Sequence, residues 1–237
     1  MIVTAAQRLA EWLHPLSPAG LKSRYEEAYW RWIRLREGEM TNFHFEEFFT
    51  TRFGMTRDDY EGAAVLDVGC GPRGSLEWAV GASERVGVDP LAERYARWGA
   101  GRHAMTYVAA AAEHMPFGDA RFDVVSSFNS LDHVDDVDAA LSEIARVTKP
   151  GGSFLLITDV GHRPTLTEPQ RLDWDLLQHA ALARSFERVD AARYERCEKG
   201  IFESVRRAVP FDESTKKRRY GVLKAHFRRL PGERAHL

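Results

Sequence analysis

Short apolar runs alternate with helix-like stretches in the middle of the chain, and this alternation predicts a parallel α/β sheet. Between about residues 62 and 160 the runs read AAVLDVG, RVGVD, MTYVAA, FDVVSSF and SFLLITDV. Helices are expected to begin near Ser75, Pro90 and Asp136, with another after Met115. Strands that are almost continuously apolar are typical of βαβ units whose sheet is covered on both faces.

The flanking segments predict a helical cap before the sheet and more strands after it. Residues 1–55 have aromatic side chains at helical spacing and no strand-like alternation. Beyond a helix around 169–184, FERVDAARYE and IFESVRRAV are expected to be two further strands, paired antiparallel. The predicted fold is a Rossmann-like, doubly wound, mostly parallel seven-stranded sheet. It comprises a cap at 1–55, a core at 56–209 and a basic tail at 210–237.

Composition adds limits on location and partners. The two cysteines, Cys70 and Cys197, form no Cys-x-x-Cys pair and are too few for a disulfide framework. No window approaches about 18 uninterrupted apolar residues, and the N-terminus lacks a secretory pattern, so a cytoplasmic protein without a membrane partner is expected.

From Ser214 onward there are 8 Lys or Arg and one acid, which leaves 25 basic and 34 acidic residues before it. The net negative charge before Ser214 disfavours binding of nucleic acid, whereas the basic residues after it would attract nucleic acid. A basic tail that is simply solvated is the simpler interpretation.

The stretch LDVGCGPRG carries the first candidate chemistry. Gly69, Gly71 and Gly74 form a G-x-G-x-x-G pattern between a predicted strand and a predicted helix. Glycine permits positive φ and close backbone approach, so a nucleotide-type cofactor can lie over the end of the strand. Asp89 ends the next strand, 22 residues after Asp67, where a carboxylate can reach a ribose diol.

Asp67 distinguishes between cofactors. Its carboxylate lies two residues before the first glycine, where a dinucleotide would place its pyrophosphate. Two anions there would repel each other, while a cofactor with a cationic ammonium and sulfonium would be favoured. Asp67 therefore argues against NAD.

With these residues in place, four blocks resemble the class I S-adenosylmethionine-dependent methyltransferases, in particular the small-molecule, ubiquinone-pathway-like group. The blocks are VLDVGCGPRG, VGVDP, AAEHMPFGDARFDVV and EIARVTKPGGSFLL, in order over about residues 62–160. The resemblance implies S-adenosyl-L-methionine as cofactor, bound by Asp67, Gly69, Cys70, Gly71, Asp89, Pro90, Ala112, Glu113 and Asn129. Many members carry an acid where this chain has Ala111, so the adenine is expected to be held by backbone and packing.

The loop after the fourth strand supplies the catalytic candidates. Methyl transfer is an in-line displacement that requires alignment of the acceptor and, for a hydroxyl or ammonium group, removal of a proton. His133 can accept that proton and Asp132 can orient it or bind substrate. Alternatively, His133 only packs on the cofactor and the acids that follow begin a helix. The residues after Asn129 lack the two prolines and aromatic residue of amine-directed enzymes, which weighs against adenine or glutamine N-methylation.

Two more positions are candidates for substrate contact. His162 lies in the polar loop after the fifth strand, with Asp159, Arg163 and Glu168. An acid-base pair or a metal ligand set could be drawn from this loop, but its spacing matches no tight metal motif, so substrate contact is favoured and no metal is expected. An ordinary surface loop is the alternative. Trp30 belongs to the cap, where aromatic residues are more often core than pocket, but the resemblance implies a helix that covers the cofactor. The predicted function is methyl transfer to an O or N atom of a small molecule. The alternatives are an RNA or protein methyltransferase and a non-catalytic adenosine-ligand binding protein; the oligomeric state is not predicted.

Overall fold

The computed structural model describes residues 18–38, 40–214 and 220–231 and centres on one seven-stranded sheet. Its strand order is β3-β2-β1-β4-β5-β7-β6. The strands are β1 (Ala64–Val68), β2 (Glu84–Val88), β3 (Thr106–Val108), β4 (Phe122–Phe128), β5 (Thr148–Val160), β6 (Phe186–Glu195) and β7 (Gly221–Arg229). Strands β1 to β5 pair in parallel, and β7 pairs antiparallel with both β5 and β6. The mostly parallel, seven-stranded, Rossmann-like sheet is confirmed.

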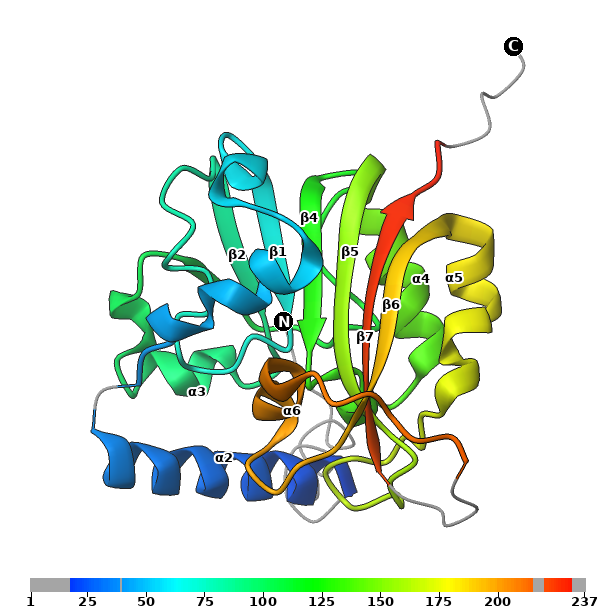
Figure 1. The fold of residues 1–237 in the computed structure, drawn as a ribbon. Helices are drawn as coiled ribbons and strands as arrows, with labels where there is room; N and C mark the ends of the chain where they lie inside the picture. The colour runs from blue at the N-terminus through cyan, green and yellow to red at the C-terminus, as the bar shows by residue number, and fades with distance from the viewer. Residues whose placement is uncertain (1–17, 39, 215–219, 232–237) are drawn as a thin grey trace, which may run out of the picture.

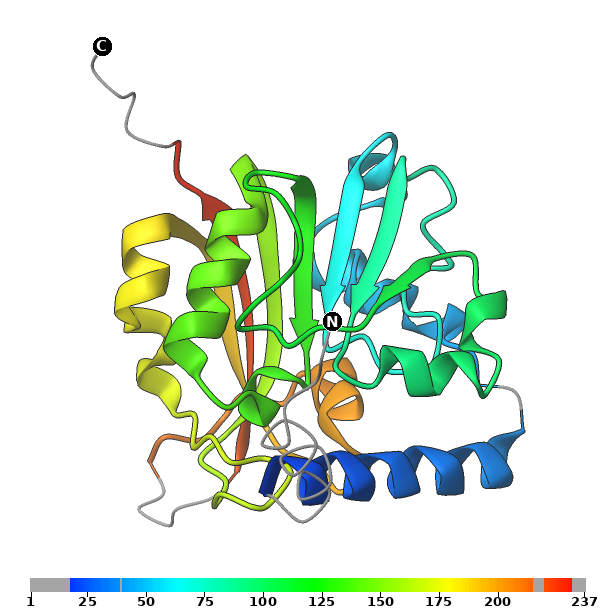
Figure 2. The same cartoon turned by 180° about the vertical axis from the view of Figure 1, so that it is seen from behind.

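Helical segments cover both faces of this sheet (Figures 1 and 2). The α-helices are α2 (Pro18–Glu37), α3 (Ala92–Ala96), α4 (Val137–Val147), α5 (Ala180–Ser185) and α6 (Ile201–Arg207). The 3-10 helices are η2 (Phe43–Phe48), η3 (Thr51–Phe53), η4 (Arg57–Tyr60), η5 (Ala100–Arg102), η6 (Leu131–His133) and η7 (Trp174–Gln178). One core cluster packs α4 and α5 on one face, and the other packs α6 and aromatic residues from 48–60 on the opposite face. No helix in these ranges is long and apolar enough to cross a bilayer.

Helix α4 begins where its sequence predicts. The Asp136 side chain accepts a hydrogen bond from the Ala139 N–H at 3.0 Å, and Asp138 places a second acid in the first turn. Leu141 and Ile144 lie on the buried face, at the spacing of an amphipathic helix. The helix expected near Asp136 is confirmed.

Two expected helices before β4 are absent from the described structure. Residues 71–82 form a series of turns, and no helix follows Met115 before β4. Gly71 and Gly74 have φ of +57° and +69°, values that interrupt a right-handed helix. The Ser75 hydroxyl bonds to the Asp67 carboxylate at 2.5 Å instead of capping a helix. The helix expected over 169–184 is divided into η7 and α5.

The prediction for the C-terminal strands is wrong in one element. IFESVRRAV forms α6, in which Ile201 and Val205 are buried at i and i+4. The strand that completes the sheet is β7, which lies within the segment assigned to a basic tail. Inside it Lys224 and His226 are buried, because Lys224 Nζ bonds to Asp190 at 2.8 Å and His226 Nε2 contacts Ser153 Oγ at 3.0 Å. Residues 215–219 and 232–237 of the tail lie outside the described residues.

Candidate functional site

The candidate site lies at the carboxyl edge of the sheet, between β1 and β4. The chain leaves β1 towards β2 and β3 and then returns to β4 on the other side, so this is the point where strand order reverses. In open α/β sheets ligands bind at such a switch point. Figure 1 shows α2 running across this same edge, beneath the ends of the parallel strands.

The three glycines predicted to need unusual backbone angles have them. Gly69, Gly71 and Gly74 have φ of +72°, +57° and +69°. A Cβ on Gly69 would lie 2.2 Å from the Cβ of Ser130, so no side chain fits between the two loops. The Ser130 hydroxyl itself donates to the Val68 carbonyl at 2.8 Å and ties the β4 loop to the end of β1. The result is a tight loop with room for close backbone approach.

Asp67 is a buried carboxylate held by two hydroxyl groups. Ser75 Oγ donates to Oδ2 at 2.5 Å, and Ser126 Oγ donates to Oδ1 at 2.7 Å. Burial raises the pKa of Asp67 to about 6; the two hydrogen bonds oppose this shift and the charge of Asp89 adds to it. Since each carboxylate oxygen can accept more than one hydrogen bond, Asp67 keeps acceptor capacity towards the loop.

Asp89 joins the glycine loop to the segment after β2. Its Oδ2 accepts from the Gly71 N–H at 3.1 Å, and its Oδ1 accepts from the Leu91 N–H at 2.8 Å. Burial raises the pKa of Asp89 to about 6 against these two hydrogen bonds. Two buried carboxylates with positive-φ glycines between them suit a cation better than a pyrophosphate. The residues present therefore fit S-adenosylmethionine, which carries an ammonium and a sulfonium.

The other predicted cofactor residues differ in their surroundings. Cys70 is buried, and burial raises the pKa of its thiol. Pro90 is exposed beside Asp89, while Ala112 is part of the main core cluster. Asn129 has φ +55°, a left-handed conformation that asparagine tolerates, and turns the chain at the end of β4.

Glu113 has a structural role in this arrangement. Its Oε1 accepts from the N–H groups of Asp135 and Asp136, at 2.7 and 3.1 Å. These bonds fix the loop that precedes α4. The predicted adenine contact of Glu113 stays a prediction.

Helix α2 contacts all three loops of the site. The Trp30 ring lies 3.2 Å from where a Cβ on Gly71 would be and packs edge-on against Tyr95. Glu27 forms an ion pair with Arg94 after β2, and Lys22 Nζ bonds to the carbonyl of His133 after β4. Trp30 thus lies beside the glycine loop, and its predicted contact with substrate stays a prediction. Trp32, two residues further along the helix, is 52% exposed.

A polar cluster lies beside the glycine loop, where the β4 and β5 loops meet. The two loops are joined by a bond of 3.2 Å from the Gln170 N–H to the Asp132 carbonyl. Donor atoms of Asp132, His133 and Glu168 all lie within 4.8 Å of one another, and His162 Nε2 is 3.6 Å from Asp132 Oδ2. The structure thus brings together the predicted catalytic pair and the predicted substrate residue His162.

The sequence analysis missed a further member of this cluster. Glu26 Oε1 lies 3.3 Å from His133 Nδ1. Glu26 precedes Trp30 by four residues, so both lie on one face of α2. That spacing is the signal that could have identified it.

The cluster shifts the pKa values of its members. Burial raises the pKa of Asp132 to about 6, the His133 charge lowers it, and the charges of Asp159 and Glu168 add to the increase. For His133, burial lowers the pKa, but the bond to Glu26 and the nearby carboxylates outweigh burial, so the pKa is raised. The cluster is therefore a site where proton affinities are perturbed by both desolvation and charge.

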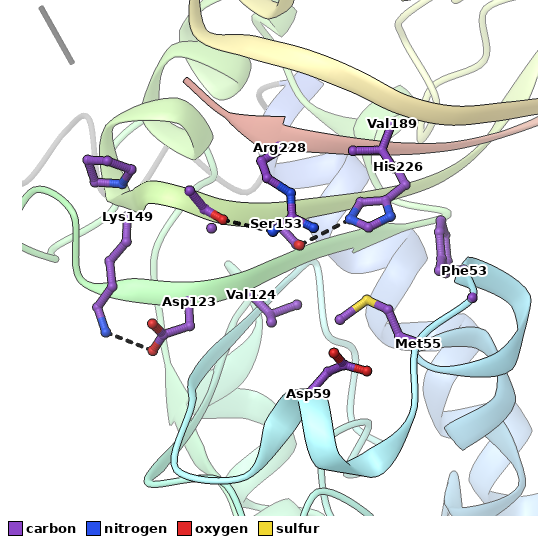
Figure 3. A pocket seen from close by; sticks show the side chains of 14 residues that line it. Phe53, Met55, Asp59, Asp123, Val124, Lys149, Ser153, Val189, His226 and Arg228 are labelled. Carbon is purple, nitrogen blue, oxygen red and sulfur yellow. Dashed lines mark hydrogen bonds and ion pairs between the residues drawn. The ribbon is translucent and has the colours of Figure 1, made fainter. Parts of the chain in front are cut away.

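A separate cavity of about 490 Å³ opens at the opposite edge of the sheet, around the turn that begins β5 (Figure 3). Lys149 Nζ bonds to Asp123 Oδ2 there at 2.7 Å, and His226 contacts Ser153. None of the predicted site residues lines this cavity. It is remote from the carboxyl edge and takes no part in the candidate site.

Comparisons with known proteins agree with the fold. Residues 66–156 match the family model described as a methyltransferase domain. The demethylmenaquinone methyltransferase of Thermobifida fusca is 39% identical over 127 residues, which cover 50% of this chain and 52% of that protein. The malonyl-[acyl-carrier protein] O-methyltransferase of Erwinia billingiae is 36% identical over 99 residues, 41% of this chain and 39% of that protein. The chain thus spans about half the length, or less, of these relatives.

A solved structure extends the likeness of the fold beyond the matched segment. The putative S-adenosylmethionine-dependent methyltransferase from Listeria monocytogenes superimposes with a TM-score of 0.56 at 16% identity. The superposition covers 80% of this chain and 99% of that one. The shared architecture therefore includes more than the segment matched by sequence.

Proposed function

We propose, on the premise that residues 66–156 belong to the methyltransferase domain family, that the protein transfers a methyl group from S-adenosyl-L-methionine to a small molecule. The acceptor atom is an oxygen or nitrogen. The observation that carries the proposal is the pair of buried carboxylates, Asp67 and Asp89, on either side of the positive-φ glycine loop. A cytoplasmic location accords with the two free cysteines.

The cofactor would be held by the carboxyl edge. Asp89 would accept from the ribose hydroxyls, because it directly follows β2 beside the glycine loop. Asp67 and the backbone of Gly69 and Asn129 would surround the methionyl end. When bound, S-adenosylmethionine supplies a methyl group already activated on a sulfonium. The protein's own task is then to align the acceptor and exclude water.

Helix α2 would exclude that water. It spans the three loops of the site, and Trp30 lies directly over Gly71. Entry of cofactor and acceptor then requires this helix to move, as lids do in many transferases.

The polar cluster is the proposed acceptor site. Glu26 can accept only from an N–H of His133, which places the proton of the neutral ring on Nδ1 and leaves the lone pair on Nε2. Nε2 of His133 has no hydrogen-bond partner in the part of the chain that the structure describes and can take the proton of an acceptor hydroxyl. Oδ1 of Asp132 accepts no hydrogen bond from the described residues and can orient the same group.

Calorimetric titration of the purified protein with S-adenosylmethionine, S-adenosylhomocysteine and NAD tests the first step. Micromolar binding of the first two without NAD is expected, followed by transfer of labelled methyl groups to phenolic or carboxylic acceptors. Binding of NAD alone would overturn the proposal. Binding without transfer to any acceptor would favour the non-catalytic alternative, and transfer to RNA or protein would favour the macromolecular one.

Asp89→Ala should weaken S-adenosylmethionine binding by about 10- to 100-fold, the range for losing hydrogen bonds to a charged group. Asp175→Ala, a change at an exposed acid of η7, is the matched control and should leave the affinity unchanged. Equal affinities for the two variants, each folded by circular dichroism, would show that Asp89 does not bind the cofactor.

A further inference from the structure

Three buried polar atoms of the cluster next to the glycine loop have no hydrogen-bond partner among the described residues. They are Asp132 Oδ1, His133 Nε2 and His162 Nε2. Asp132 is 1% exposed and His162 is 4% exposed, so water has little access to them. A buried polar atom without a hydrogen-bond partner destabilises the protein, because its lost hydration is not replaced. Three such atoms in one place indicate a group that binds there.

Both histidines present a lone pair to the cluster. His162 Nδ1 lies 3.1 Å from the Arg163 carbonyl, which can only accept, so this nitrogen carries the proton of the neutral ring. In the same way, the Glu26 carboxylate lies 3.3 Å from His133 Nδ1 and can only accept, so Nδ1 carries the proton of the neutral His133 ring. A histidine whose second nitrogen donates to a carboxylate or carbonyl is the arrangement that supports metal ligation through the other nitrogen.

The distances suit one cation. Donor atoms of Asp132, His133 and Glu168 lie within 4.8 Å of one another, His133 Nε2 is 4.0 Å from Glu168 Oε1, and His162 Nε2 is 3.6 Å from Asp132 Oδ2. Ligands bound at about 2.1 Å to a single ion are roughly 3 to 4 Å apart. Small side-chain rotations would bring these donors onto one centre.

The charge balance points the same way. Asp132 and Glu168 face the cluster, and Glu26 and Asp159 lie behind it. Arg196 pairs with Asp159 at 2.7 Å, and Lys22 is directed at Asp135 and the His133 carbonyl. Neither of these two cations pairs with Asp132 or Glu168, so a bound metal cation could lie between the two carboxyl groups.

We infer that Asp132, His133 and Glu168, with His162 as a fourth donor, bind a divalent first-row transition-metal cation. Two imidazoles and two carboxylates favour Zn²⁺, Mn²⁺ or Fe²⁺ over Mg²⁺ or Ca²⁺. The His133 and Glu168 side chains are 29% and 39% exposed, so one side of the ion would stay open. The role of the ion rests on the proposed function: it would coordinate an acceptor oxygen and lower its pKa, and His133 would then act as a ligand instead of a base.

Metal binding can be measured without an acceptor. Tag-free protein is treated with EDTA, dialysed and titrated with Zn²⁺ by calorimetry, and Co²⁺ is added separately to record its visible absorption. We expect one equivalent of Zn²⁺ with micromolar or tighter affinity and a Co²⁺ spectrum typical of nitrogen and oxygen ligands. Asp132→Asn, which preserves shape, should weaken Zn²⁺ at least tenfold, and Glu26→Gln about tenfold through His133.

His179→Ala is the control, since His179 pairs with Asp138 away from the cluster. Circular dichroism of every variant shows whether it is folded, and titration with S-adenosylmethionine tests the proposed function separately. Zn²⁺ binding that is absent, or equal in Asp132→Asn and wild type, overturns the metal site even where S-adenosylmethionine binds. Zn²⁺ binding lost in Asp132→Asn supports the site even where S-adenosylmethionine fails to bind and the proposed function falls.

Discussion

At the scale of single residues, the site is built from carboxylates that are costly to bury. Asp67 and Asp89 are less than a tenth exposed, and each has a pKa of about 6 because burial disfavours its charge. Their pKa values in the unfolded chain are near 4, so their ionisation above that pH reduces the stability of the free protein. Groups retained at such a cost are typical of binding sites.

The same shift predicts the pH dependence of cofactor affinity. The positively charged cofactor favours ionised carboxylates, so affinity should be full above pH 6 and fall as pH drops through about 6. At pH 5 we expect a loss of about tenfold for each carboxylate involved, measured by calorimetry between pH 7.5 and 5. S-adenosylhomocysteine, which lacks the sulfonium charge, should lose less. Flat affinity over this range, with the fold intact by circular dichroism, would contradict the assignment.

The sequence identified much of the site at this scale but not how it is assembled. Gly69, Asp67 and Asp89 follow from a local pattern, because the strand, the turn and the acid are contiguous in the chain. Glu26 lies in α2, before the first strand, and Glu168 lies in the loop after β5. Both are far from His133 in the sequence, and only the fold brings them to it. Such meetings depend on long-range packing, which no spacing rule encodes.

At the scale of elements, α2 is the part of the site with the fewest restraints from the core. It lies across the carboxyl edge, held by ion pairs and by Trp30, while Tyr25 and Tyr29 are at least half exposed. A helix attached mainly through its side chains can detach without unfolding the sheet. This arrangement suits a lid.

The ion pair between Glu27 and Arg94 provides a test of that attachment. Glu27→Arg should place two cations together and speed hydrogen exchange of the α2 amides by about fivefold, the effect of losing roughly 1 kcal/mol. Combining it with Arg94→Glu should restore the wild-type rate, measured by mass spectrometry. Arg31→Glu, on an exposed part of the same helix, is the control. Equal exchange in all four proteins would show that the pair does not hold α2.

Sequence patterns predicted the elements unevenly for physical reasons. Strands β1 and β4, at the centre of the sheet, are almost fully buried and appear as apolar runs, whereas β3 at the edge of the sheet is at most half-buried. The stretch at 201–209 contains Ile, Phe and Val, which favour strands, but its buried positions are four apart and it forms α6. The sequence pattern did not predict strand β7, because Lys224 and His226 occupy buried positions where apolar residues are expected.

At the scale of the whole molecule, β7 ties the basic C-terminal segment to the fold. It lies between β5 and β6 and hydrogen-bonds to both, and Leu223 and Phe227 enter the main core cluster. The charge count that suggested a nucleic-acid-binding tail therefore includes side chains that are part of the sheet, such as Lys224. The sum of charges along a segment does not reveal which of them face solvent.

Truncation after Ser214 should consequently abolish the fold instead of merely removing a polyanion-binding tail. It would delete an inner strand, expose the paired edges of β5 and β6 and remove buried apolar residues. We expect loss of the cooperative thermal transition by circular dichroism and aggregation in size-exclusion chromatography. A chain ending at Pro231 retains β7 and should melt cooperatively, close to the full-length protein. If the shorter chain also melts cooperatively at the same temperature, β7 is dispensable, and RNA binding lost on truncation could then be attributed to the tail itself.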